Sequence, residues 1–157
     1  MASRHESRER ALQMLFLWDQ RRDTPEQVIA GYWDGLWSED LPPEERPPRR
    51  IIDEFANELL EGAVRRVEEA DRLIVAHAEH WRLERMAAVD RNVLRLAVYE
   101  LLEGHTPAPV VIDEALEIAR RFSADESVQF INGVLDAVRK ALEGGSETLD
   151  AAGHTGV

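Results

Sequence analysis

Hydrophobic residues recur at three- and four-residue steps along most of the chain, and no stretch alternates apolar and polar residues as a half-buried strand would. This periodicity predicts helices over about residues 3–20, 24–36, 49–69, 71–79, 90–103, 107–122 and 125–143. The stretch 38–48 contains four prolines and four acidic residues and is predicted to be an exposed linker. About seven helices with short connections indicate an all-α bundle.

Polar residues and glycines mark where these helices begin and end. Ser3 and Glu6 have the spacing of a capping box, and Thr24 precedes Pro25 with Gln27 three residues on. Gly104 follows the last apolar residue of its helix, where a left-handed residue is expected.

Composition bounds the class of protein. The 157 residues are 44% hydrophobic, enough for a core, and contain no cysteine, which excludes disulfides and thiolate metal sites. The N-terminal residues have no apolar core like that of a signal peptide, and no stretch approaches about 18 apolar residues. We therefore expect a cytoplasmic protein without a membrane contact.

The net charge of −12 is distributed unevenly. Residues 1–22 carry +2 and the remainder −14. A generic nucleic-acid binder carries excess positive charge, so any RNA contact is expected at the N-terminus and its neighbours. The acidic body would repel phosphate elsewhere and limit non-specific binding.

The motifs of common enzymes and metal sites are absent. No glycine-rich phosphate loop, G-x-S-x-G elbow or H-E-x-x-H motif occurs. His77 and His80 lie three residues apart, but solvated histidines explain them better than a site without a third ligand. The carboxylate pairs at 113–114 and 125–126 lie in first turns of helices, where negative charge complements the helix dipole. We expect no enzyme, cofactor or metal.

Arginines at the N-terminus offer the clearest candidate chemistry. Arg4 and Arg8 lie four residues apart, on one face of the first helix, with His5 beside them. Guanidinium groups suit phosphate contact and stacking on the bases of single-stranded RNA. The same arginines could instead pair with Glu6 and Glu9. Composition leaves these two interpretations open.

Three segments resemble motifs of one known protein family. Residues 7–16, S-R-E-R-A-L-Q-M-L-F, are similar to its A-R-E-x-A-x-Q-x-L-Y start. Residues 89–101, V-D-R-N-V-L-R-L-A-V-Y-E-L, resemble its central L-R-x-A-x-Y-E helix. The third and most specific segment spans residues 111–136, where V-I-D-E-A at 111–115 and S-V-Q-F-I-N-G-V-L-D at 127–136 resemble its I-N-E-A and F-V-N-G-V-L-D signature. The family that these segments resemble is NusB, the bacterial transcription antitermination proteins.

This resemblance implies a fold, a function and partners. The fold is two packed three-helix-type subdomains, which we expect at residues 1–80 and 81–143, followed by a disordered tail at 144–157. The function is antitermination through the boxA element of nascent ribosomal-RNA leader transcripts. The implied partners are boxA RNA, ribosomal protein S-ten (NusE), and RNA polymerase with the other Nus factors.

The resemblance also implies RNA-contacting residues. The family's basic N-terminus falls on Arg4, His5 and Arg8, where Glu6 and Ser7 interrupt the usual basic run and Arg10 partly compensates. The other positions that match the family's RNA path are Phe16, Asp90, Glu126 and Phe130. The phenylalanines could stack bases or fill the core, and the acids could accept hydrogen bonds from bases or cap helices.

Three further points stay open to test. Asp113 stands where the family more often has asparagine, a change expected to have a small effect. Gly133, inside the last helix, is interpreted as a point of close helix packing. The alternative function is a homodimeric interaction module with little RNA affinity, using the aromatic helix with Tyr32, Trp33 and Trp37, although core filling explains those rings better.

Overall fold

The computed structural model describes residues 3–36, 40, 42–45, 53–79 and 81–154, with side chains up to residue 144. These residues form helices joined by turns and contain no strand, so the all-α prediction is confirmed. None of the described helices combines the length and the apolar character needed to cross a membrane. The chain forms two compact units, Met1–Arg65 and Arg66–Val157, which are described separately below.

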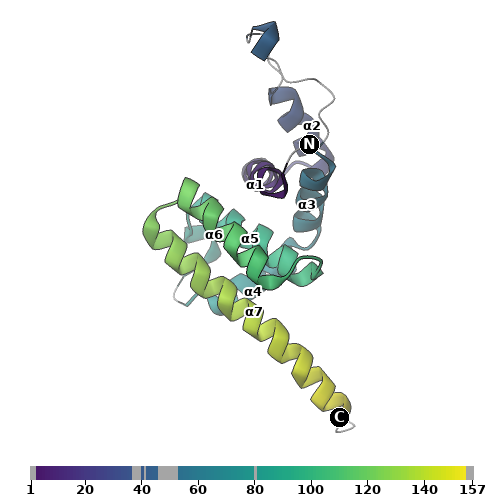
Figure 1. The fold of residues 1–157 in the computed structure, drawn as a ribbon, viewed down its shortest axis with the longest axis vertical. Helices are drawn as coiled ribbons and strands as arrows, with labels where there is room; N and C mark the ends of the chain where they lie inside the picture. The colour runs from purple at the N-terminus through teal and green to yellow at the C-terminus, as the bar shows by residue number, and fades with distance from the viewer. Residues whose placement is uncertain (1–2, 37–39, 41, 46–52, 80, 155–157) are drawn as a thin grey trace. The chain divides into compact units, whose positions relative to one another are not determined.

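The first unit contains three α-helices: α1 (Arg4–Arg21), α2 (Pro25–Leu36) and α3 (Glu54–Arg65), with the short 3-10 turn η1 (Pro43–Glu45) before α3. Both α2 and α3 pack against α1 (Figure 1). The side chains that share the centre of this unit are fully buried and apolar: Ala11, Met14, Leu15 and Leu60.

The predicted starts of α1 and α2 are confirmed at the level of single hydrogen bonds. Ser3 caps α1, and its hydroxyl accepts a hydrogen bond of 3.1 Å from the backbone N–H of Glu6. At α2, the Thr24 hydroxyl accepts from the Gln27 N–H at 3.2 Å, while the Gln27 carboxamide oxygen accepts from the Thr24 N–H at 3.0 Å. This reciprocal pair is a capping box, which supplies acceptors to two backbone N–H groups at the start of α2.

The second unit contains α4 (Val67–His77), the 3-10 turn η2 (Leu83–Arg85), α5 (Ala88–Glu103), α6 (Ala108–Phe122) and α7 (Asp125–His154). In this unit α5 packs against α4, α6 and α7, so it forms the centre (Figure 1). Its core consists of fully buried aliphatic side chains: Ile74, Leu94, Val98, Ile131 and Leu135. Gly104 ends α5 in the left-handed conformation, with φ of 70°, as predicted.

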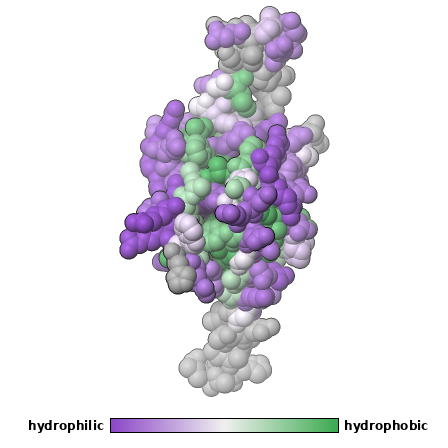
Figure 2. Space-filling model, turned by 90° about the vertical axis from the view of Figure 1, so that its left-hand side faces the viewer, coloured by the Kyte–Doolittle hydropathy of each residue, from purple (hydrophilic) through white to green (hydrophobic). Residues whose placement is uncertain are grey.

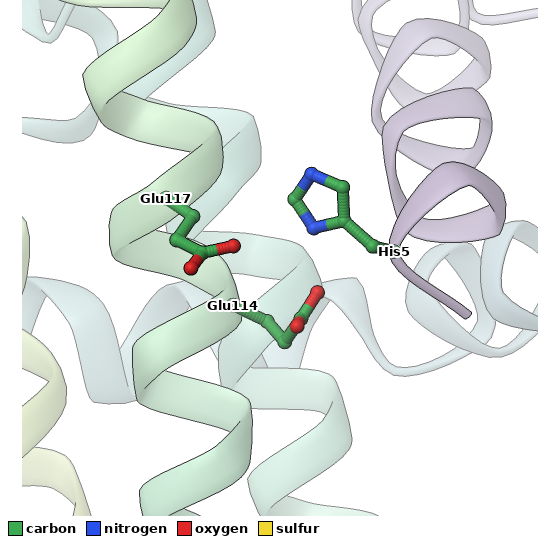
Figure 3. A group of neighbouring side chains, drawn as sticks. All are labelled: His5, Glu114 and Glu117. Atoms are coloured by element: carbon green, nitrogen blue, oxygen red, sulfur yellow. The ribbon is translucent and has the colours of Figure 1, made fainter. Parts of the chain in front are cut away.

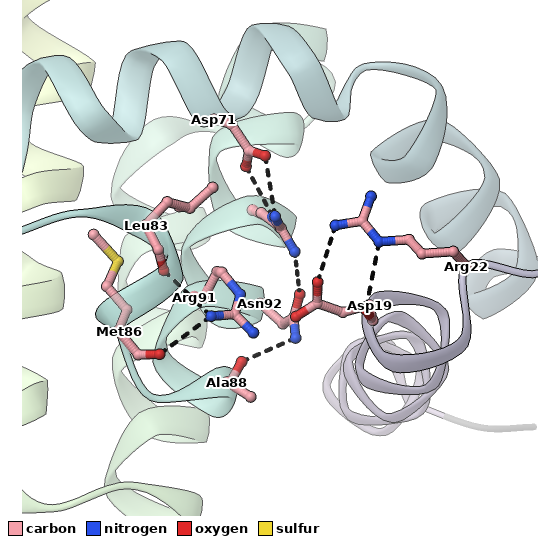
Figure 4. A network of polar contacts seen from close by, with 9 residues as sticks. Asp19, Arg22, Asp71, Leu83, Met86, Ala88, Arg91 and Asn92 are labelled. Atoms are coloured by element: carbon pink, nitrogen blue, oxygen red, sulfur yellow. Dashed lines mark hydrogen bonds and ion pairs between the residues drawn. The ribbon is translucent and has the colours of Figure 1, made fainter.

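Polar side chains hold α4, α5 and η2 together. The Arg95 guanidinium, 3% exposed, donates to both carboxylate oxygens of Asp71 at 2.8 and 3.0 Å, and to the Asn92 side chain at 3.1 Å. One Arg91 nitrogen donates to the carbonyls of Leu83 and Met86, each at 3.2 Å (Figure 4). The segment between α4 and α5 is thus fastened to the start of α5.

The helix predicted over residues 49–69 is not continuous. α3 ends at Arg65 and α4 begins at Val67, because Arg66 leaves the helical region with φ of −105° and ψ of 19°. Residues 49–52 lie outside the described residues. Leu60 before the break and Ile74 after it belong to the cores of different units, and this change of core explains the interruption. The two units accordingly divide at residues 65 and 66, whereas the sequence placed the boundary at residue 80.

Two predictions about the last helix are also wrong. Gly144 and the glycine after it do not end α7, which continues to His154 through most of the predicted tail; residues 155–157 lie outside the described residues. A glycine costs a helix about 1 kcal/mol but does not sterically end it. Gly133 is exposed, and a Cβ added there would meet no atom within 4 Å, so it is no point of close helix packing.

Apolar side chains are not confined to the interior. On the face drawn in Figure 2, hydrophobic patches lie among hydrophilic side chains. The large apolar side chains with the most exposed surface among the described residues come from both units and range from 41% to 52%: Leu36, Val75, Trp81, Val110 and Phe122.

Candidate nucleic-acid interface

The N-terminal arginines lie against an aromatic ring. In the first unit the Arg4 guanidinium carbon is 3.8 Å from the centre of the Phe55 ring, and that of Arg8 is 5.6 Å from it. Arg4 is exposed, whereas Arg8 is only 5% exposed. Stacking on the ring holds the Arg4 guanidinium in place while its edge stays in solvent, an arrangement suited to an anion.

Asp53 links α1 to α3 and was not found from the sequence. Its carboxylate accepts hydrogen bonds from the Ser7 hydroxyl at 2.8 and 3.0 Å, from Arg10 at 2.9 Å and from the Ala56 N–H at 3.0 Å. Burial by itself would raise the pKa of Asp53, but the bonds from Ala56, Arg10 and Ser7 together lower it below its ordinary value. Ser7 therefore has a structural role, because its hydroxyl donates to the carboxylate that joins α1 to α3.

The remaining predicted residues of α1 have mixed surroundings. His5 extends from the first turn of α1 (Figure 3), and its Nε2 is 3.0 Å from the Glu9 carboxylate, one turn along the helix. Arg10 is shared between Asp53 and the Trp33 ring, whose centre is 6.0 Å away. Phe16 is half-buried, two turns beyond Arg8.

In the second unit Asp90 does not cap α5. The helix begins at Ala88, and its cap residue makes no side-chain hydrogen bond. Asp90 is 8% exposed, and its two oxygens accept hydrogen bonds from the hydroxyls of Ser123 at 2.7 Å and Ser127 at 2.8 Å. Asp90 thus ties the start of α5 to the end of α6 at Ser123 and to the first turn of α7 at Ser127.

The other two residues predicted in this unit, Glu126 and Phe130, lie on α7 close to Ser127, which donates a hydrogen bond to Asp90. Glu126 is exposed in the first turn of α7, and Phe130 is half-buried one turn further on. The Phe130 ring centre is 6.0 Å from that of Trp81, with the two planes at 56°. Trp81 is 52% exposed and was not among the residues predicted from sequence. Asp90, Glu126 and Phe130 therefore gather around one end of α5 and α7.

Acidic side chains cover part of α6. Glu114 and Glu117 leave the helix on the same side, one turn apart (Figure 3), and Asp113 is exposed. His77 ends α4 half-buried, and His80 lies outside the described residues.

Comparison with known proteins decides the family. The model of the NusB family matches residues 5–140. The chain belongs to the NusB family. A "Transcription antitermination protein NusB" from Solibacter usitatus is 57% identical over 142 residues, which cover 90% of this chain and 92% of that protein.

Solved NusB structures share the fold. One of T. maritima NusB has a TM-score of 0.70 and 35% identity, covering 88% of this chain and 92% of its own. A crystal structure of antitermination factors NusB and NusE in complex with dsRNA has a TM-score of 0.70 and 28% identity, covering 88% and 96%. The NusB-like fold expected from the sequence is confirmed.

Proposed function

We propose that this chain is a transcription antitermination factor that binds the boxA element of nascent ribosomal-RNA leader transcripts together with ribosomal protein S-ten (NusE). The observation that carries this proposal is the 57% identity to a transcription antitermination protein over nearly the full length of both chains. The fold shared with a NusB bound to NusE and RNA supports both proposed partners.

In the first unit, the proposed RNA contacts are Arg4, His5, Arg8, Arg10 and Phe16. Arg4 supports this best, because its guanidinium is exposed and already positioned by Phe55. Arg10 has a competing partner in Asp53, and Arg8 is almost fully buried. We therefore assign the salt-dependent part of binding in this unit mainly to Arg4.

In the second unit, the proposed contacts are Asp90, Glu126 and Phe130. Glu126 is exposed and can accept hydrogen bonds from base amino or imino groups. Phe130 offers part of its ring for stacking. Both Asp90 oxygens already accept from serines, so Asp90 would act on RNA chiefly by holding the turn that carries Glu126.

The proposed mechanism is avidity. Weak contacts to RNA and to S-ten reinforce each other, because binding to one partner raises the effective concentration of the other. The pair would then load onto RNA polymerase with the other Nus factors, in the cytoplasm. No step of this mechanism requires catalysis.

The alternative, a homodimer with little RNA affinity, would use the aromatic side chains of α2. Tyr32 is 9% exposed and donates a hydrogen bond of 2.7 Å to Gln13, and the Trp33 ring nitrogen donates to Asn57 at 3.0 Å. These contacts direct both rings into the first unit and favour core filling. Trp37 lies outside the described residues. Sedimentation with and without RNA would detect a dimer.

The deciding experiment is a titration of boxA RNA and a scrambled control, each with and without S-ten. We expect preference for boxA, and tighter binding with S-ten present. Arg4→Gln should weaken binding and reduce the slope of log affinity against log salt by about 0.7, the value for one phosphate contact on a single strand. Equal affinity for both RNAs, even with S-ten, would contradict the proposal.

A further inference from the structure

The segment from Trp81 to the end of η2 carries exposed side chains that the proposed function has not used. Trp81 is 52% exposed, the largest fraction among the large apolar side chains that the structure describes. Arg82 and Arg85 are also exposed, with one acid, Glu84, between them. Residues 81–85 therefore carry one aromatic ring, two cations and one acid in a chain whose net charge is −12.

The segment is held in a fixed shape. The Trp81 N–H donates to the Ala78 carbonyl at 3.1 Å, and the Arg85 N–H to the Arg82 carbonyl at 3.0 Å. Arg91 on α5 donates to the carbonyls of Leu83 and Met86 (Figure 4). The exposed side chains therefore stand on an ordered backbone, which reduces the entropy lost when they bind a ligand.

The ring of Trp81 continues an aromatic surface. Its centre lies 6.0 Å from that of Phe130, within the usual range for interacting rings, and Phe130 is itself a proposed stacking residue. Through Ser127, one turn before Phe130, the same part of α7 is tied to Asp90. Trp81 thus extends the proposed RNA-contacting group of the second unit by a second ring.

We propose that residues 81–85 form a second RNA-contact element, in which Trp81 and Phe130 each stack an unpaired base and Arg82 and Arg85 contact phosphates. This inference rests on the proposed function and adds residues to it. Aromatic rings with basic neighbours are the combination that binds single-stranded nucleic acid, since every base has a stacking face and every nucleotide a negative charge. Two exposed arginines favour a polyanion over an apolar protein surface.

The test is boxA titration with full-length variants. Trp81→Ala should weaken binding by about ten-fold, as loss of one stacked base does. The double variant Arg82→Gln/Arg85→Gln should reduce the salt slope by about 1.4, or about 0.7 for each phosphate contact. Its matched control is Arg72→Gln/Arg120→Gln, which removes two exposed arginines from α4 and α6 and has the same net charge. The control should leave the slope unchanged.

A second readout guards against a folding defect in Trp81→Ala. Trp81→Phe keeps a ring and should bind boxA nearly as well as the unaltered protein. The quenching of tryptophan emission that saturating boxA produces should be clearly smaller in Trp81→Phe. Undiminished quenching would mean that no base touches the indole, and it would overturn the proposal.

The outcomes separate this inference from the proposed function. If the unaltered protein does not distinguish boxA from scrambled RNA, both fail. If it does, and Phe130→Ala weakens binding while Trp81→Ala does not, only the second contact element is refuted. If Trp81→Ala leaves RNA affinity intact but weakens S-ten binding or self-association, the surface binds protein, and the RNA assignment is wrong.

Discussion

At Asp53, one carboxylate accepts hydrogen bonds from Ser7, Arg10 and the backbone of Ala56. The two elements it joins are 46 residues apart at Ser7, so no local pattern in the sequence could pair them. A buried carboxylate with three donors is strongly favoured in its charged form. Both the stability of the first unit and its dependence on pH should therefore respond to this residue.

Asp53→Asn should lower the free energy of unfolding by about 2 kcal/mol at neutral pH, because the neutral amide still caps α3 but loses the charged hydrogen bonds with Arg10 and Ser7. Because the folded-state pKa of Asp53 is below its ordinary value of 3.8, its contribution is present above that pH and is lost as the pH falls through the folded value. Urea unfolding of both proteins from pH 7 downward should show the curves converging below about pH 4.

Asp136→Asn is the matched control, since Asp136, whose side chain is 40% exposed, pairs with Lys140 and Arg139 on α7 and its pKa is also lowered. Water competes for those partners, so this variant should change stability far less. An equal loss of unfolding free energy in both variants would contradict the role of Asp53 as the link between α1 and α3.

Gly133→Ala should stabilise the protein by about 0.5–1 kcal/mol, because alanine is the better helix former and its Cβ meets nothing within 4 Å. Gly104→Ala provides the contrast. At φ of 70° a side chain is strained even though space is free, so this variant should lose stability. Thermal unfolding measures both, and a loss at Gly133 would restore the packing interpretation.

At the scale of elements, the sequence was informative wherever a helix end is coded by adjacent residues. Ser3, the pair Thr24 and Gln27, and Gly104 all act as predicted because capping involves residues within one turn. The break at Arg66 was missed because apolar residues continue across it at helical spacing. The helical turns before and after Arg66 pack into different cores. The residues that form those cores lie far along the chain, so the spacing of apolar residues does not reveal the change of core.

The candidate site, like the helices, could be predicted only in part from the sequence. The resemblance placed Asp90, Glu126 and Phe130, and the structure brings them to one end of α5 and α7. Trp81 was not among the residues predicted from sequence, since nothing local reveals that its ring meets Phe130. The exposed Trp-Arg-x-x-Arg pattern at residues 81–85 is the signal that could have found it.

The packing of α4 on α5 should depend on Arg95. Arg95→Met leaves the Asp71 carboxylate, 22% exposed, without its guanidinium partner and should cost about 2 kcal/mol, less than for a fully buried pair. Asp71→Ala should cost less in the Arg95→Met background than alone, and urea unfolding of the four proteins gives that difference. The more exposed pair of Arg66 and Glu69 serves as control, and there the two changes should add.

At the scale of the whole molecule, charge is unevenly distributed, and under the proposed function the acidic surface should repel any RNA that lacks the specific contacts. Residues 1–22 carry +2 against −14 for the rest, and exposed acids lie on α3 and α4 at Glu58, Glu61 and Glu68. Contacts at a few arginines and rings can outweigh this repulsion for the cognate RNA, because they act at short range. An RNA that does not make these contacts is repelled by the acidic side chains and gains no attraction to offset the repulsion.

Removing part of the acidic surface should therefore reduce specificity and leave the site itself intact. Glu58→Gln, Glu61→Gln and Glu68→Gln together should tighten binding of scrambled RNA several-fold at low salt, with a smaller gain for boxA, so that their affinity ratio falls. The corresponding three Glu→Asp changes keep the charge and should leave the ratio as it was. The effect should fade near 1 M salt, where the Debye length falls to about 3 Å. If the ratio is unchanged at low salt, selectivity arises wholly from the contacts themselves, and the acidic surface has no part in it.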